Sequence, residues 1–176
     1  MIKYIALLKG INVGGHKKVP MADLREVLSK SGLEKVKTYI QSGNIVFQSP
    51  EKNSRNLEKS IQKLIIDKFG FEVSILVRTR QELLRTFNDL PFPKDKKVKS
   101  YFTILSHIPD EELVKIASEK VYEGEEYYII NYCIYFYCEK GYGKAKFNMN
   151  YFETKLNTIR TARNYNTMVK LLSMSV

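Results

Sequence analysis

The sequence predicts an α+β fold in two subdomains, and three observations support that prediction. Short apolar segments of strand length alternate with segments whose apolar residues recur at helical spacing. A stretch rich in proline and lysine, Pro91–Lys97, interrupts this alternation near the middle of the chain. A length of 176 residues is long for one average domain and short for two. We therefore place the two subdomains at residues 1–93 and 94–176.

The first subdomain is expected to begin with a central strand and a helix. Lys3–Leu8 is almost wholly apolar, which is typical of a strand buried on both faces. A loop follows, and Pro20 suits the first position of a helix that Gly32 ends. The buried stripe of this helix is predicted to carry Met21, Leu24, Val27 and Leu28.

A hairpin, a second helix and a fourth strand are expected next. Strands are predicted at Lys37–Gln41 and Asn44–Gln48, because Ser42-Gly43 between them can form a tight turn. Apolar residues at i, i+4, i+7 and i+8 predict a helix over Arg55–Phe69. A strand is predicted at Glu72–Val77. The resulting order, βαββαβ, is that of the ferredoxin-like sandwich.

The second subdomain is expected to repeat part of this order. A capping box at Thr79–Glu82 opens a connecting helix. Beyond the linker we predict a strand at Ser100–Ser106 and a helix with an acidic first turn that starts at Pro109. A hairpin is predicted at Glu126–Asn131 and Cys133–Cys138. The tail is predicted to be helical at Ala145–Leu156 and Thr167–Leu172. The second subdomain is therefore predicted to be a smaller βαββα-type unit.

The charge of the chain is unevenly distributed. The formal net charge is +10. Residues 1–100 carry 20 basic and 10 acidic groups. Residues 101–139 carry 2 basic and 8 acidic groups, and residues 140–176 carry 7 basic groups and 1 acidic group. A basic body with a basic tail suggests a polyanionic partner. There are two alternatives. The charge could serve only to maintain solubility, or the acidic stretch could pair with the basic tail within the protein.

The two cysteines and the N-terminus indicate a cytoplasmic protein. Cys133 and Cys138 lie an odd number of residues apart in one expected strand, so they should face opposite ways as free thiols. The first apolar stretch is too short for a signal peptide, and no run is long enough to span a bilayer. We expect a soluble, unexported protein, and the oligomeric state stays open.

A glycine-rich loop after the first strand is the best local candidate for a site. Its candidate ligand-binding residues are Lys9, Asn12, Gly14 and Gly15. Glycine backbone at a strand-to-helix junction can hold an anion. Gly10 and Gly15 have the spacing of a P-loop, but His16 replaces its lysine and no Ser or Thr follows, which excludes a nucleotide triphosphatase of that class. A purely structural glycine turn is the alternative.

Two further polar segments could bind a ligand. The hairpin residues Gln41, Ser42 and Asn44 offer amides and a hydroxyl, which also suit turn formation alone. In the segment Thr161–Thr167, Arg163 could hold a phosphate or carboxylate in a bidentate contact. The alternative is that Asn164 or Asn166 caps a helix and Arg163 serves in a structural ion pair.

Other residue types suggest little chemistry. Tyr127–Tyr137 holds five tyrosines, which could stack bases or dock a partner but more often pack a sheet face against a helix. His16 and His107 are the only histidines, and no His, Cys or carboxylate cluster has metal-ligand spacing. We predict no metal and no cofactor.

Three segments resemble one uncharacterised family. The successive signatures of the bacterial domain-of-unknown-function family 1697 are resembled by three segments: residues 6–15 with 19–24, residues 38–47, and residues 161–167. The family usually has arginine where Lys9 stands, tryptophan at Tyr165 and proline near Ile159. The resemblance implies two α+β subdomains, the first ferredoxin-like, and no activity. It marks Asn12, Gln41, Ser42, Asn44, Arg163 and Asn164 as signature residues.

The leading functional hypothesis is a binding module for a phosphate-bearing ligand, either a nucleotide or a nucleic acid. A small hydrolase or transferase that uses the glycine loop as an anion cradle is a second hypothesis, supported only by analogy with acylphosphatase, which shares the topology. A protein-interaction module acting through the tyrosine-rich hairpin is a third. We lean against an enzyme. The glycine loop and the hairpin turn are expected at opposite ends of the sheet, as two separate features.

Overall fold

The computed structural model describes all 176 residues, which form two compact units. The first unit consists of Met1–Arg85 together with Lys170–Val176, and the second of Thr86–Val169. The division expected from sequence, between residues 93 and 94, differs in two ways: it assigns residues 86–93 to the first subdomain and the last seven residues to the second.

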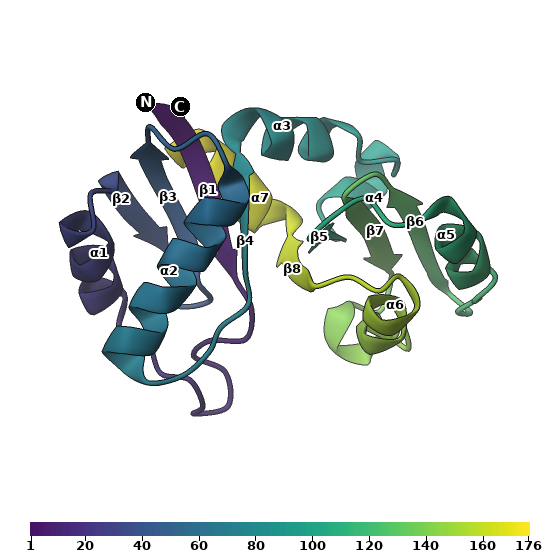
Figure 1. Cartoon of the computed structure of the whole chain (residues 1–176). Helices are drawn as coiled ribbons and strands as arrows, with labels where there is room; N and C mark the ends of the chain where they lie inside the picture. Colours follow the sequence, from purple (N-terminus) through teal and green to yellow (C-terminus); the bar gives the residue numbers. More distant parts are fainter. The chain divides into compact units, whose positions relative to one another are not determined.

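The first unit contains a four-stranded antiparallel sheet. Its strands are β1 (Ile2–Leu8), β2 (Glu34–Tyr39), β3 (Asn44–Ser49) and β4 (Ile75–Thr79), in the spatial order β2-β3-β1-β4. The helices α1 (Met21–Lys30) and α2 (Ser54–Phe69) cover one face of this sheet (Figure 1). This is the split βαββαβ arrangement of the ferredoxin-like fold, so the predicted fold class is confirmed.

The core of the first unit forms between that sheet face and the two helices. The expected stripe residues Leu24 and Leu28 of α1 are fully buried, and so are Ile61 and Ile65 of α2. Asn53 caps the start of α2, because its side chain accepts a hydrogen bond from the Arg55 amide at 3.0 Å. Helical periodicity and local capping therefore agree with the tertiary packing.

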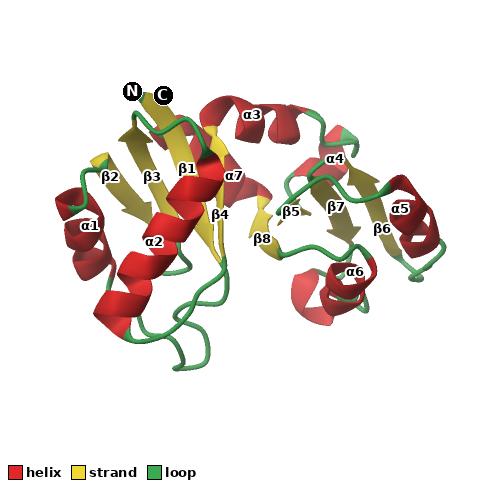
Figure 2. Cartoon of the chain, in the orientation of Figure 1, coloured by secondary structure: helices red, strands yellow, loops and turns green.

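The second unit repeats the same topology. Its elements are β5 (Ser100–Leu105), α5 (Glu111–Ser118), β6 (Glu125–Ile130), β7 (Cys133–Cys138), a short 3₁₀ turn η1 (Tyr142–Lys144), α6 (Met149–Lys155) and β8 (Arg160–Asn164). The strand order β6-β7-β5-β8 matches that of the first sheet (Figure 2). The second unit is thus a full βαββαβ unit, with one strand more than the sequence predicts.

The unexpected strand is β8, which lies in the segment expected to be a polar part of the tail. Its two buried side chains are Thr161 and Arg163, both polar. An alternation of apolar and polar residues is what marks a half-buried strand in sequence. Because β8 lacks buried aliphatic side chains, its sequence does not carry that pattern.

Three helices lie outside these two repeats: α3 (Arg80–Asn88), the short α4 (Lys94–Lys97) and α7 (Tyr165–Met174). The predicted capping box of α3 is present, since Glu82 accepts from the Thr79 amide at 2.7 Å and Thr79 Oγ1 accepts from the Glu82 amide at 3.2 Å. In the second unit, the end of α3 packs Phe87 on Phe102 with ring centroids 5.7 Å apart. None of the helices has the length and apolar character to cross a bilayer.

Candidate functional site

The glycine loop and the β2–β3 turn meet at one end of the first sheet. β1 and β3 are antiparallel neighbours, with Leu7 opposite Asn44, so the end of β1 lies beside the start of β3. The Leu8 amide donates to the Gly43 carbonyl at 2.8 Å. Our expectation that the two features lie at opposite ends of the sheet is therefore wrong. The antiparallel pairing brings two of the three signature segments together.

The glycine loop forms a small hairpin, residues 12–18, which we call the finger. Gly14 and Gly15 both have positive φ, at 59° and 77°, and the His16 amide donates to the Val13 carbonyl at 3.0 Å. Two consecutive residues of positive φ between the two hydrogen-bonded residues of a turn are the pattern of a type I′ turn. The finger extends beyond the end of the sheet (Figure 1). The two glycines therefore serve a turn, as in the structural alternative, and expose their backbone at its tip.

Asn12 fastens the base of the finger to the β2–β3 turn. Its Oδ1 accepts from the Val19 amide at 2.8 Å, and its Nδ2 donates to the Val19 carbonyl at 3.0 Å and to the Gln41 carbonyl at 2.7 Å. These bonds use the acceptor and both donors of the side-chain amide. Asn12 is thus a positioning residue that holds two loops in fixed relation, and not a free group for a ligand.

The β2–β3 turn, residues 40–43, is closely packed on its inner side. Asn44 is fully buried and its Nδ2 donates to the Tyr39 carbonyl at 3.1 Å and to Ser42 Oγ at 3.0 Å. A Cβ added to Gly43 would lie 2.6 Å from Leu8 Cβ, so this position admits glycine alone. The side chains of Gln41 and Ser42 remain exposed. Asn44 therefore shapes the turn, whereas Gln41 and Ser42 face solvent.

Ile40 in this turn has a strained backbone. Its φ is 50°, and a β-branched residue rarely adopts the left-handed region. Its side chain is nevertheless 50% exposed, and Val13 in the finger is 63% exposed. Strain of this kind persists only where the surrounding structure imposes it. The hydrogen bond from Asn12 to the Gln41 carbonyl, which we call the clasp, is one such constraint on the adjacent Ile40.

The finger carries two lysines and a histidine. His16, Lys17 and Lys18 are exposed, and Lys17 Nζ donates to the Glu72 carbonyl at 2.8 Å. Lys9 is half-buried at the base of the loop, where its amide donates to the Ser74 carbonyl at 2.9 Å. The first unit has 17 basic and 8 acidic residues, while the second has 12 and 11. The excess charge of the chain therefore belongs almost entirely to the first unit.

The third signature segment has a structural role in the second unit. Arg163 is buried, and its Nη1 donates to Thr161 Oγ1 and to the Ala162 carbonyl, both at 2.8 Å. Burial lowers the pKa of its guanidinium to about 10. Asn164 Oδ1 accepts from the Thr167 amide at 2.8 Å, which caps α7 as in the helix-cap alternative. These two residues maintain the edge of the second sheet and the start of a helix.

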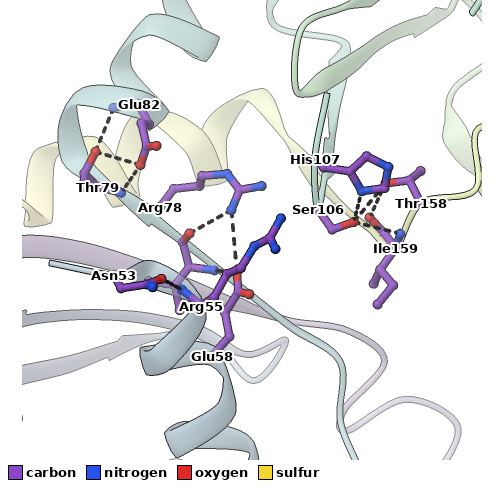
Figure 3. Close-up of polar contacts among 11 residues, drawn as sticks. Asn53, Arg55, Glu58, Arg78, Thr79, Glu82, Ser106, His107, Thr158 and Ile159 are labelled. Carbon is purple, nitrogen blue, oxygen red and sulfur yellow. Dashed lines mark hydrogen bonds and ion pairs between the residues drawn. The ribbon is translucent and has the colours of Figure 1, made fainter. Parts of the chain in front are cut away.

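Arg78 is the counterpart of Arg163 in the first unit, and sequence reasoning missed it. Arg78 lies opposite Ile5 on β1, and Arg163 opposite Phe102 on β5, which are corresponding positions of the two sheets. Arg78 Nη1 donates to the Val77 carbonyl at 2.8 Å and lies 3.6 Å from Glu58 Oε1 (Figure 3). Only the strand register reveals the correspondence, because the surrounding sequences differ.

A serine–histidine contact occurs at the end of β5. Ser106 Oγ lies 3.0 Å from His107 Nδ1 and 3.0 Å from Thr158 Oγ1, and it accepts from the Ile159 amide at 3.2 Å (Figure 3). No hydrogen bond joins His107 to a carboxylate that could orient it as a base. The contact ties two loops of the second unit together. No three His, Cys, Asp or Glu side chains are grouped to hold a metal ion.

The tyrosine-rich hairpin packs both of its faces inside the second unit. Tyr127 lies against Phe152 with ring centroids 4.9 Å apart, and the Tyr135 hydroxyl donates to the Thr86 carbonyl at 2.7 Å. Tyr128 and Tyr137 both contact the ring of Phe92. Cys133 and Cys138 are buried free thiols, as expected. Most of the tyrosines therefore belong to the packing of the sheet.

Comparison with known proteins gives a family but no activity. The conserved bacterial protein SP0830 from Streptococcus pneumoniae has a similar structure, with a TM-score of 0.79 and 28% identity over 99% of both chains. No curated protein matches the chain significantly. The family described as "Protein of unknown function (DUF1697)" matches residues 1–135, more than half of the sequence. The chain therefore belongs to the DUF1697 family, as its signature segments suggested.

Proposed function

We propose that the first unit binds a phosphate-bearing ligand, and that this ligand is a nucleic acid. The observation that carries the proposal is the exposed, basic finger held against the β2–β3 turn by Asn12. Nucleic-acid backbones are contacted by lysine side chains, by polar side chains and by backbone amides. The finger and the turn offer all three kinds of group at one end of the unit.

The shape of the finger favours a polymer over a small nucleotide. Small ligands bind in concave pockets that bury most of their surface. The finger is instead a projecting hairpin whose residues 13–18 are all exposed. A projecting hairpin can enter a groove or follow a backbone, where its contacts are spread over several phosphates. The exposed donors of Gln41 and Ser42 lie beside its base and extend this surface.

The rigidity of the site also favours binding. One hydrogen bond of Asn12 ties the finger to the turn and two more, to Val19, close its base, so the finger loses less freedom when a ligand binds. The positive field of the whole unit adds a long-range attraction for a polyanion. We further propose a bacterial cytoplasmic location, which the free buried thiols and the bacterial relative support.

The proposal can be tested by fluorescence anisotropy with a labelled single-stranded RNA and a labelled DNA duplex at several salt concentrations. In the double variant Lys17→Ala/Lys18→Ala, affinity should fall, and the slope of log K against log salt should decrease by about 1 for each phosphate that a lysine no longer neutralises. The matched control is Lys59→Ala/Lys63→Ala, which removes two exposed lysines from α2 in the same unit.

Three outcomes are distinguishable. A loss confined to the finger variant supports the proposal. An equal loss in both variants means that general charge, and not the finger, drives binding. Binding of a fluorescent ATP analogue, with no binding of either polymer, would assign the site to a small nucleotide instead.

A further inference from the structure

The edge strand β6 borders a groove in the second unit. β6 is the terminal strand of its sheet and pairs only with β7. A groove of about 440 Å³ runs along it, lined by all six residues of β6 and by Ser118 and Lys120–Tyr122 from the segment after α5. Val121 stands in this groove with 84% of its surface exposed, and Tyr128 with 47%. An edge strand beside a groove is the setting in which proteins bind extended peptides.

Each of the other three sheet edges carries a bulge or side-chain hydrogen bonds to its backbone. β2 is interrupted by a bulge between Glu34 and Lys37, which disrupts a regular edge. On β4, the Val77 amide donates to Glu58 Oε1 at 2.8 Å and its carbonyl accepts from Arg78. On β8, the Ala162 carbonyl accepts from Arg163. Unpaired edges invite association and are normally protected in this way.

β6 has no such protection over its middle. Its register with β7 is unbroken for six residue pairs, and the two-residue turn 131–132 makes Ile130 and Cys133 a hydrogen-bonded pair. Because hydrogen-bonded and non-bonded pairs alternate, the backbone groups of Tyr127 and Ile129 point away from β7. They present a row of donors and acceptors spaced for an added strand.

We propose that the β6 edge binds an extended, basic segment of a partner protein as a fifth strand. The charge of the region selects a basic partner. Glu119 and Glu123 are exposed beside the groove, and residues 101–139 carry 8 acidic and only 2 basic groups. Of the two carboxylates that line it, Glu126 pairs with Lys96 and Glu125 accepts from the Lys146 amide, so the exposed pair supplies the unpaired charge. Val121 and Tyr128 offer apolar contacts for alternate side chains of the added strand.

Solution NMR on the full chain tests this proposal, with an octapeptide that alternates lysine and valine as the probe. The expected result is a shift of the amide signals of Tyr127 and Ile129 at saturating peptide. A second probe is the same peptide N-methylated at every residue, which keeps the charge but has no backbone donor with which to pair as a strand. Its affinity should be lower by about tenfold, since several backbone hydrogen bonds cannot form.

Two protein variants separate backbone pairing from charge and packing. Ile129→Pro removes an outward amide, which edge strands tolerate, and Ile129→Ala is its matched control with the amide kept. Only the proline variant should lose most of the affinity. Val121→Lys, at an exposed position, should weaken binding without affecting the fold. Absence of binding, equal binding of both peptides, shifts confined to the finger, or a β6-dependent dimer in sedimentation would each overturn the proposal.

Discussion

The two units share a topology but differ in the loop that follows their first strand. In the first unit this loop spans residues 9–20 and carries the basic finger, while in the second it spans only residues 106–110. The arginines at corresponding edge positions, Arg78 and Arg163, show that the frameworks of the two sheets match in detail. The sheets therefore act as supports, and the candidate functions lie in their loops and edges.

The largest effect is expected at the turn between the second and third strands, which differs between the units. Gly43→Ala should lower the free energy of unfolding by about 2–4 kcal/mol, because the new Cβ would lie 2.6 Å from Leu8 Cβ at a φ of 81°. Gly15→Ala, at a similar φ in open space, should cost only about 1 kcal/mol. Urea unfolding measures both, and equal losses would refute the close packing of this turn.

The two edge arginines should respond alike if the units are equivalent. Arg78→Met and Arg163→Met should each cost about 1–3 kcal/mol, because each leaves a strand carbonyl without its donor. Thermal unfolding of the two single variants measures this directly. A large loss in one variant with none in the other would break the correspondence that the register indicates.

A smaller effect is expected from Asn12, which has no counterpart in the short loop of the second unit. Asn12→Gly tolerates the φ of 54° but removes the clasp, so stability should fall by about 1 kcal/mol. Amide exchange should accelerate at Val19, whose amide loses its acceptor. If the finger binds nucleic acid, affinity in the anisotropy assay should fall as well. Unchanged exchange at Val19 would show that the clasp does not hold the finger.

The smallest expected effect is a pH dependence of stability from Glu58, which contacts Arg78 on the edge strand of the first sheet. Burial raises the pKa of the Glu58 carboxyl above its usual 4.5, despite the hydrogen bond from the Val77 amide and the charge of Arg78. The folded state therefore binds a proton more readily than the unfolded state. Relative to Glu58→Gln, the wild type should lose stability as pH rises from below 4.5 through the raised pKa, and stay constant above it. The opposite slope in urea titrations would show that the Arg78 contact dominates.

Much of the fold follows from the sequence by simple rules. Apolar spacing located α1 and α2, and the capping pattern located the start of α3. Strand β8 was not predicted, because its buried side chains are threonine and arginine. Packing energy from distant elements, and not a local pattern, determines that such a segment becomes a strand.

The candidate site was only partly predictable. Sequence reasoning selected Asn12, Asn44 and Arg163 as ligand groups, but all three hydrogen-bond the surrounding backbone. A signature amide or guanidinium does not reveal by itself whether its partner is a ligand or a carbonyl. The meeting of the finger with the β2–β3 turn was available from topology, because antiparallel β1 and β3 place those loops at the same end.

The membership of Lys170–Val176 in the first unit has a consequence for the synthesis of the chain. A ribosome synthesises β1 before the second unit and these residues after it, so the first unit cannot be complete until Lys170–Val176 have emerged. Until then, the face of its sheet that includes Val46 lacks Met174, Ser175 and Val176, which line a groove with it in the finished protein. The nascent first half must therefore remain partly open during translation, a state in which chaperone contact is most useful.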